Sequence, residues 1–223
     1  MRIAIIGASG FVGLRLVERL HLEGRAEVVP IAHAYRSLAV LARFALPWKV
    51  ADATDTDALA EALKGCDAVV HAALGNAPQI VAMAEALYPA AERAGIKRIV
   101  ALSSAAVHSL TPVPGTDENT PILTAQKSEY NVAKARAELL LTRARRKGRV
   151  ELVQLRPSII HGPRSRLVPT SPVSCLPIPP TWSATAPRSA MPSPSTTWST
   201  PSGSPSPPLP PTATASCSTT GRR

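Results

Sequence analysis

Apolar segments of strand length alternate with helical patterns from residue 2 to residue 155, and this alternation constrains the fold more than any other feature. Strands are expected at residues 2–6, 27–32, 48–50, 68–72, 98–103 and 151–155. Helical segments are expected at residues 11–23, around 38–42, and at 55–63, 78–94 and 128–146. Strands that alternate with helices predict an α/β fold with a doubly wound parallel sheet. In such sheets, ligands bind beyond the carboxyl ends of the strands.

A glycine-rich segment with the sequence Gly-Ala-Ser-Gly-Phe-Val-Gly, residues 7–13, connects the first expected strand to the first helix. Its glycines permit a tight turn, a close approach of the backbone to a pyrophosphate, and close packing of the helix on the strand. The phosphates would then lie at the helix N-terminus. The alternative is a strand-to-helix turn without a ligand. We expect a dinucleotide to be bound there by Gly7, Ser9, Gly10, Phe11, Val12 and Gly13.

Tyr130 and Lys134 lie four residues apart in the last expected helix, so their side chains share one helix face. A phenol normally loses its proton near pH ~10, and a neighbouring cation lowers that pKa. A tyrosine placed in this way can act as a general acid and base near neutrality, as a carbonyl reduction requires. The motif is weak by itself, but here it follows the glycine-rich segment and a strand that ends at Ser103-Ser104. We therefore expect Tyr130 and Lys134 to be catalytic.

The composition of the chain changes abruptly at about residue 163. Residues 164–223 contain 14 Pro, 13 Ser and 10 Thr, and every acidic residue lies at or before Glu151. Prolines at this density prevent persistent helices and central strands, and the scattered apolar residues cannot offset the chain entropy. We expect residues 1–163 to form the dinucleotide-binding domain and residues 164–223 to be a disordered tail. Our hypothesis is that a frameshift produced the tail; a Pro-rich docking segment or a glycosylated stalk is the alternative.

The formal net charge of +10 at pH 7 raises the question of nucleic-acid binding, but no basic stripe with interleaved aromatic residues is present. The one basic cluster, residues 143–149, ends a helix, where cations interact favourably with the helix dipole. The three cysteines show no paired spacing, so neither a disulfide framework nor a metal site is expected. No run of about 18 apolar residues and no signal-peptide pattern occurs. We expect no nucleic-acid partner, no membrane span and a cytoplasmic location.

The Gly-x-x-Gly-x-x-Gly spacing, the Ser-Ser strand end and the Tyr-x-x-x-Lys motif together make residues 1–163 resemble the short-chain dehydrogenase/reductase superfamily. They are most similar to its extended branch, the NAD-dependent epimerase/dehydratase family, which has a Rossmann-type fold. The resemblance implies that Ser104 orients the substrate oxygen, with Ser103 as the second choice, and that Tyr130 transfers the proton. It also implies that Lys134 binds the nicotinamide ribose and tunes Tyr130. For the two serines, the alternative is a strand end that only caps a loop.

The resemblance extends to the ends of three further strands. Asp52-Ala53 matches the segment whose carboxylate accepts a hydrogen bond from the adenine amino group, although Asp52 could instead cap the following helix. Ala72-Ala73 matches the small residues that line the cofactor. Pro157 lies in the segment that the family places beside the nicotinamide. His71 is expected to be a packed residue at a strand end and not a catalyst.

The choice between NAD and NADP depends on the end of the second strand. An acidic residue there would bind the ribose 2′-hydroxyl and favour NAD, but residues 32–36 contain no carboxylate. His33 and Arg36 could accept a 2′-phosphate, although a surface arginine explains Arg36 equally well. We expect NADP or NAD as the cofactor, with NADP slightly favoured.

The resemblance implies an NAD(P)-dependent oxidoreductase that acts on a hydroxyl or carbonyl group of a small molecule. Nucleotide sugars are the first expected substrates, and steroid-like or flavonoid-like alcohols and ketones follow. Extended family members build much of the substrate pocket from the C-terminal part, which the tail replaces here. The rival interpretation is therefore a non-catalytic remnant or an NAD(P)-binding sensor. The family also forms dimers through the helix that carries Tyr130, and the apolar run at residues 137–141 is compatible with such a homodimer.

Overall fold

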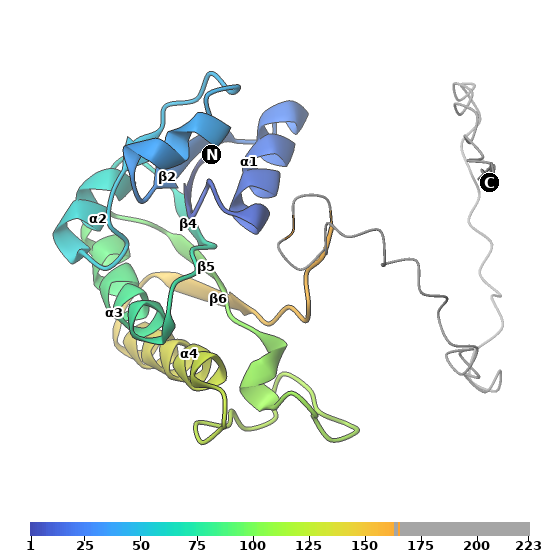
Figure 1. The fold of residues 1–223 in the computed structure, drawn as a ribbon. Helices are drawn as coiled ribbons and strands as arrows, with labels where there is room; N and C mark the ends of the chain where they lie inside the picture. The colour runs from blue at the N-terminus through green and yellow to red at the C-terminus, as the bar shows by residue number, and fades with distance from the viewer. Residues whose placement is uncertain (163–164, 166–223) are drawn as a thin grey trace, which may run out of the picture. The chain divides into compact units, whose positions relative to one another are not determined.

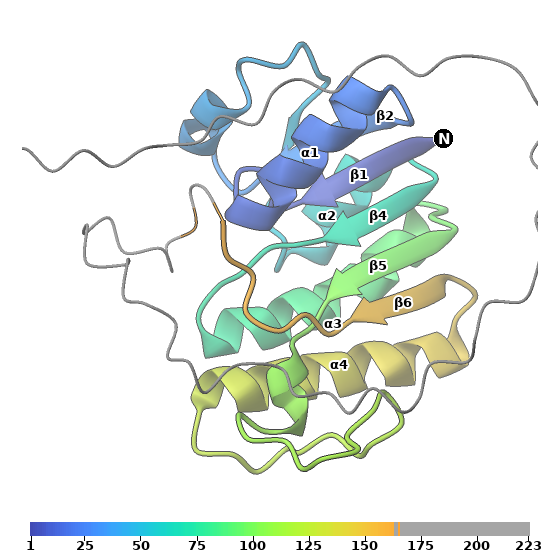
Figure 2. The same cartoon turned by 90° about the vertical axis from the view of Figure 1, so that its right-hand side faces the viewer.

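Six parallel strands form one sheet in the computed structural model, which describes residues 1–162 and residue 165 (Figures 1 and 2). The predicted tail otherwise lies outside the described residues. The sheet order is β3-β2-β1-β4-β5-β6. The strands are β1 (Arg2–Ile6), β2 (Glu27–Ala32), β3 (Lys49–Val50), β4 (Ala68–His71), β5 (Arg98–Leu102) and β6 (Glu151–Leu155). The α-helices are α1 (Phe11–Glu23), α2 (Thr56–Leu63), α3 (Ala77–Arg93) and α4 (Glu129–Lys147), and two 3₁₀ helices are η1 (Tyr35–Val40) and η2 (Ala105–His108).

The predicted doubly wound parallel sheet is confirmed, and the expected strands and α-helices occur within one or two residues of their predicted bounds. The segment around residues 38–42 differs, because it forms the 3₁₀ helix η1 and not an α-helix. Ala34 provides no side-chain cap there, and the Leu41 N–H donates to the Leu38 carbonyl three residues back. Among the described residues, no helix has both the length and the apolar character needed to cross a membrane.

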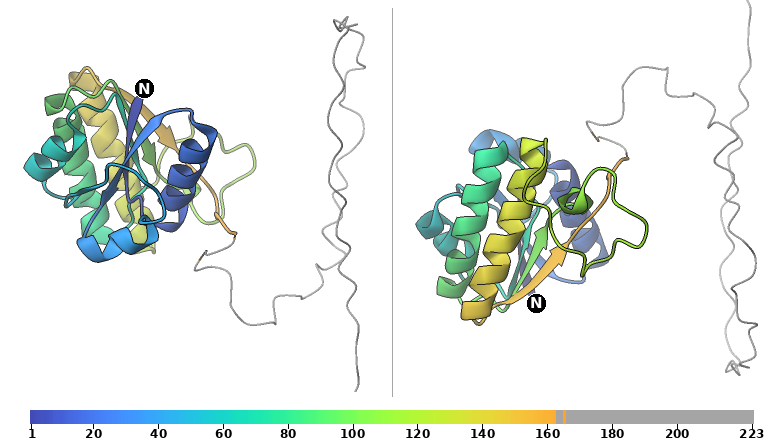
Figure 3. Two further views of the ribbon diagram at one scale, coloured as in Figure 1. Left: turned by 90° about the horizontal axis from the view of Figure 1, so that it is seen from above. Right: turned by 90° about the horizontal axis from the view of Figure 1, so that it is seen from below.

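Two apolar layers cover the two faces of the sheet. Side chains alternate along β1, so Ile3 and Ile5 pack with α1 while Ala4 and Ile6 pack with the layer formed by α2, α3 and α4. Figure 3 shows α3 and α4 side by side on one face, with α1 on the other. Strands buried on both faces need continuous apolar sequence, which explains the Arg-Ile-Ala-Ile-Ile run of β1.

The strand order reverses between β1 and β4. The chain proceeds outward from β1 to β2 and β3, then returns to β4 on the other side of β1 and continues to β5 and β6. The connections that leave β1 and β4 therefore diverge at the carboxyl edge of the sheet, which is the switch point where doubly wound sheets bind their ligands. The glycine-rich segment follows β1, and Ala72-Ala73 follows β4.

Candidate active site

The glycine-rich segment packs directly against the chain that leaves β4. Gly7 has φ +80°, a left-handed conformation that favours glycine, and a Cβ at this position would lie 2.6 Å from the Ala73 backbone nitrogen. A Cβ on Gly13 would overlap the Gly7 carbonyl group. Gly10 is the N-cap residue of α1 and provides no side-chain cap. The first N–H groups of α1 are thus free of a capping side chain, an arrangement that suits the binding of a phosphate.

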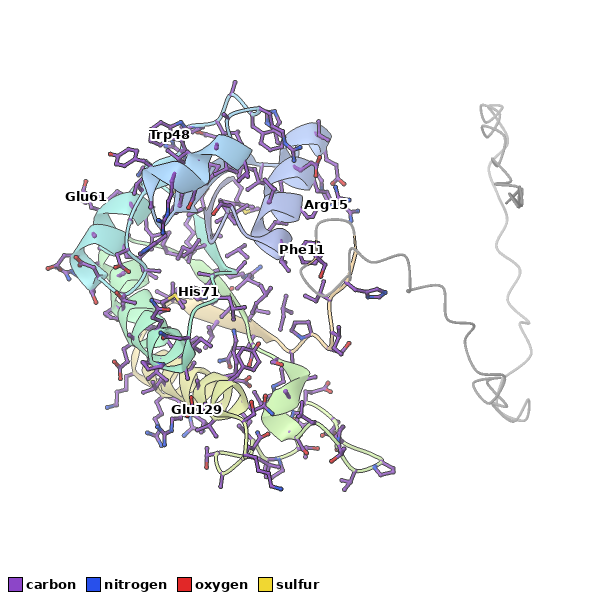
Figure 4. All side chains as sticks on the ribbon, in the orientation of Figure 1. Phe11, Arg15, Trp48, Glu61, His71 and Glu129 are labelled. Atoms are coloured by element: carbon purple, nitrogen blue, oxygen red, sulfur yellow. The ribbon has the colours of Figure 1, made fainter. Side chains whose placement is uncertain are left out.

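The other predicted residues of this segment surround the start of α1. Ser9, Phe11 and Val12 are partly exposed. The segment after β6 returns to this point, because a Cβ on Gly162 would lie 3.6 Å from the Phe11 ring. Figure 4 labels Phe11 at the end of α1 nearest this segment. The chain that contains Pro157 therefore runs from the end of β6 to the glycine-rich segment.

Asp52 lies at the end of β3 and does not cap α2. Its carboxylate accepts hydrogen bonds from the backbone N–H of Thr54 at 2.9 Å and from the Thr54 hydroxyl at 2.8 Å. These hydrogen bonds hold the Asp52 pKa below its usual value, with the backbone contribution the largest. Asp55 is the N-cap of α2 instead, since its carboxylate accepts from the N–H groups of Asp57 and Ala58. The helix-capping alternative for Asp52 is wrong, and its half-exposed carboxylate keeps capacity for a further donor.

The end of β2 carries the two basic residues predicted to select the cofactor. His33 and Arg36 are both exposed, and His33 Nδ1 lies 4.0 Å from an Asp52 carboxylate oxygen. Ala53 is buried behind Asp52. The ends of β2 and β3 thus bring His33 and Asp52 together at the same edge of the sheet as the glycine-rich segment.

Tyr130 and Lys134 lie one turn apart near the start of α4, where Ser128 is the N-cap. Lys134 is 7% exposed, and its ammonium donates a hydrogen bond to the Leu102 carbonyl at the end of β5, at 2.9 Å. Burial lowers the Lys134 pKa, while the nearby Glu138 carboxylate opposes this shift. Tyr130 is 39% exposed and lies one turn before Lys134 in the helix.

The two serines after β5 have different partners. The Ser103 hydroxyl donates a short hydrogen bond to Glu138, so it points toward α4. Ser104 is the N-cap of η2, and its oxygen accepts from the Ala106 N–H at 3.2 Å. Within the described part of the chain, the Ser104 hydroxyl has no acceptor for its own proton. Ser104 therefore caps a turn and still has an O–H that could donate to a ligand. The O–H of Ser103, in contrast, already donates to Glu138.

A buried ion pair beneath these serines was not anticipated from the sequence. Glu138 is 2% exposed and binds Arg156 through Nε at 2.8 Å and Nη2 at 2.5 Å. Arg156 Nη1 also donates to the Glu118 carbonyl and contacts His108 Nε2 at 3.1 Å. This network joins α4, the end of β6 and the chain around η2. The signal in the sequence was a lone glutamate in the apolar run of α4, four residues after Lys134 and on the same helix face.

His71 is buried at the end of β4, as predicted, and lines a cavity together with Lys134. Burial, and then the charge of Lys134, lower the His71 pKa from 6.5 to about 4. The imidazole is therefore neutral at physiological pH. A neutral buried ring suits a packed or hydrogen-bonding role and not that of a proton donor near pH 7.

The NAD dependent epimerase/dehydratase family model matches residues 3–175, and the chain belongs to this family. Two curated relatives are each 30% identical. One is N-acetyl-alpha-D-glucosaminyl-diphospho-ditrans,octacis-undecaprenol 4-epimerase of Escherichia coli O157:H7, matched over 178 residues, 74% of this chain and 50% of the relative. The other is the decarboxylating sterol-4-alpha-carboxylate 3-dehydrogenase ERG26 of Candida albicans, matched over 185 residues, 75% of this chain and 53% of the relative.

A similar solved structure is that of the Bordetella bronchiseptica enzyme WbmG in complex with NAD and UDP. It is 25% identical with a TM-score of 0.58, and the match covers 70% of this chain and 52% of WbmG. The chain thus spans about half the length of the curated relatives that it matches.

The neutral state of His71 predicts a specific pH dependence of stability. The unfolded chain protonates this histidine near pH ~6.5, but the folded protein does so only at about 4. Between these values the unfolded state binds more protons, so the free energy of unfolding falls as the pH drops. From pH 7 to pH 4.5, we expect the wild type to lose about 2.5 kcal/mol more than the His71→Gln variant. Urea unfolding at both pH values measures this difference, and equal losses would contradict a neutral buried His71.

Proposed function

We propose that this chain is an NAD(P)-dependent oxidoreductase of the epimerase/dehydratase type that acts on a hydroxyl or carbonyl group of a sugar diphosphate, first of all a nucleotide sugar. The observation that carries the proposal is the Lys134–Leu102 hydrogen bond. It holds the Tyr130 face of α4 at the carboxyl edge of the sheet, where the glycine-rich segment also lies. Two observations support this function. The chain belongs to the family, and Tyr130 and the glycine-rich segment lie at the same carboxyl edge of the sheet.

The residues present fit a dinucleotide. The backbone at Gly7 and Gly13 leaves no space for a Cβ, and the start of α1 has no capping side chain. Its N–H groups would bind the pyrophosphate, and the Asp52 carboxylate would accept from the adenine amino group. Lys134 would donate to the nicotinamide ribose through an N–H that Leu102 does not use. A bound nicotinamide supplies a reversible acceptor for a hydride.

Tyr130 would transfer the proton, and Ser104 would orient the substrate oxygen. In oxidation, the substrate carbon would lose a hydride while its hydroxyl proton passes to the Tyr130 oxygen as the general base, which leaves a carbonyl. In reduction, the carbon gains the hydride and the Tyr130 hydroxyl returns the proton to the oxygen. The free donor of Ser104 would hold the substrate oxygen in both directions. An epimerisation would need both halves in sequence, with the carbonyl presenting its opposite face in the second half.

The names of similar proteins support the substrate class and one of the two cofactors. A curated relative is an epimerase of a sugar diphosphate linked to a lipid, and the WbmG structure contains NAD and UDP. The ERG26 relative is a sterol dehydrogenase, which keeps steroid-like alcohols as a second substrate class. The WbmG complex favours NAD, whereas the exposed His33 and Arg36 favour NADP.

The Tyr130→Phe variant tests the catalytic role. It removes the proton-transfer hydroxyl and little volume, so we expect turnover to fall by about 10²- to 10⁴-fold. The NADH dissociation constant should stay within about twofold. The assay is NAD(P)H formation or epimer production from a panel of UDP- and dTDP-hexoses, with Tyr35→Phe as the exposed control. Cofactor binding by the wild type without turnover of any member of the panel would support the rival interpretation, a non-catalytic remnant or sensor.

The Arg36→Ala variant tests the cofactor preference. If Arg36 binds the 2′-phosphate, its loss should weaken NADPH binding by about 10-fold or more, since charge-assisted hydrogen bonds contribute about 1.5–3 kcal/mol. NADH binding should be unchanged, because NADH has no 2′-phosphate. Fluorescence titration with both nucleotides measures the two constants. Equal effects on NADH and NADPH, or none on either, would leave Arg36 as an ordinary surface residue.

A further inference from the structure

A small cavity lies on the inner side of the Tyr130–Lys134 face, between the ends of β4 and β5 and the helices α3 and α4. Its volume is about 30 Å³. The wall toward α3 is apolar and includes Met83 and Leu87. The polar residues that line the cavity are His71, Ser103, Lys134, Glu138 and Gln154. His71 lies on the α3 and α4 side of the sheet (Figure 4).

His71 brings an unsatisfied atom to this cavity. Its Nε2 is buried and has no hydrogen-bond partner among the described residues. A buried polar atom without a partner costs about 1–3 kcal/mol. In a neutral imidazole one nitrogen donates and the other accepts. With the proton on Nδ1, Nε2 carries a lone pair that can accept a hydrogen bond.

Lys134 and Ser103 bring the complementary groups. The Lys134 ammonium has three N–H donors, and Leu102 accepts one of them. Ser103 donates its only proton to Glu138, so its oxygen has lone pairs left to accept a hydrogen bond. Glu138 and Gln154 already have hydrogen-bond partners in the protein. Among the polar residues that line the cavity, Lys134 thus offers a free donor, and His71 and Ser103 offer free acceptors. A single molecule that can accept one hydrogen bond and donate two would satisfy all three groups.

We propose that one ordered water molecule occupies this cavity, accepts a hydrogen bond from Lys134 Nζ, and donates to His71 Nε2 and Ser103 Oγ. The cavity exceeds the roughly 10–15 Å³ that a water molecule needs, and three hydrogen bonds are typical of a buried water. His71 is then a positioning residue, because it acts on Lys134 through the water and touches no substrate. The water site requires only the cavity and its polar lining. The role of the water in orienting Lys134 toward a ribose rests on the proposed function.

Nuclear magnetic resonance of the full chain with ¹⁵N-labelled histidine tests the site without any need for turnover. We expect the His71 ring at neutral pH to be the Nδ1–H tautomer. We also expect a cross-peak between its ring proton and a long-lived water. An Nε2–H tautomer would overturn the proposal, because the ring would then donate and not accept. An Nδ1–H ring without a water cross-peak would overturn it as well, since it would leave a dry cavity or a direct contact with Lys134.

Variants at two walls of the cavity distinguish a bound water from side-chain packing without a water. His71→Leu removes the acceptor. The water should then be absent from a high-resolution crystal structure of the variant, and its slow exchange should disappear from the magnetic relaxation dispersion. Met83→Leu changes only the apolar wall and should retain the water. A retained water in His71→Leu, or a lost water in Met83→Leu, would contradict the assignment of partners. Either result is independent of whether the chain turns over a sugar.

The effect on Lys134 is measured by cofactor affinity. Loss of one hydrogen bond in the network should raise the NADH dissociation constant of His71→Leu by about 2- to 10-fold. His71→Gln can place an oxygen near the Nε2 position and should restore most of the affinity. An unchanged affinity in His71→Leu would show that the water does not orient Lys134. If the wild type binds no NADH, the proposed function fails, but the tautomer and the water can still be observed.

Discussion

The hydrogen bond from the buried Lys134 ammonium to the Leu102 carbonyl is the contact on which the candidate active site depends. An ammonium buried without partners is costly, so this bond and the nearby Glu138 carboxylate offset its desolvation. The contact ties α4 to the end of β5 and leaves Tyr130 exposed one turn earlier in the helix. A residue that would otherwise be a surface tyrosine thereby lies at the edge of the sheet where a ligand would bind.

The second constraint is the close approach of two backbones at the switch point. Gly7 and Gly13 have no space for a Cβ, because the chain after β4 and the Gly7 carbonyl occupy it. Because the N-cap residue Gly10 has no side chain, the first N–H groups of α1 also lack a side-chain cap. The glycine-rich segment and the Tyr130 face lie at one edge of the sheet because the strands are parallel, so the chain leaves β1 and β5 at the same carboxyl edge. Neither feature alone would define an oxidoreductase site.

Local sequence patterns predicted the elements and the residue types of the site, but not its tertiary pairings. The strand periodicity, the glycine spacing and the four-residue separation of Tyr130 and Lys134 are all readable within short windows. The different hydrogen-bond partners of Ser103 and Ser104 cannot be predicted in this way. The partner of Ser103 is Glu138, which lies 35 residues away along the chain. The Glu138–Arg156 pair likewise forms only when α4 packs beside β6. The sequence also left open whether Asp52 caps α2, because it closely precedes that helix, but Asp55 is the N-cap in the structure.

The central claim is that Tyr130 and Lys134 face the reactive end of a bound dinucleotide in a chain that spans about half the length of its curated relatives. A crystal structure of this chain with NAD bound tests it most directly. The account predicts the pyrophosphate at the start of α1, Lys134 Nζ within hydrogen-bond distance of the nicotinamide ribose, and the Tyr130 hydroxyl beside the nicotinamide ring. A dinucleotide bound elsewhere, or bound with Tyr130 far from its nicotinamide, would contradict the account.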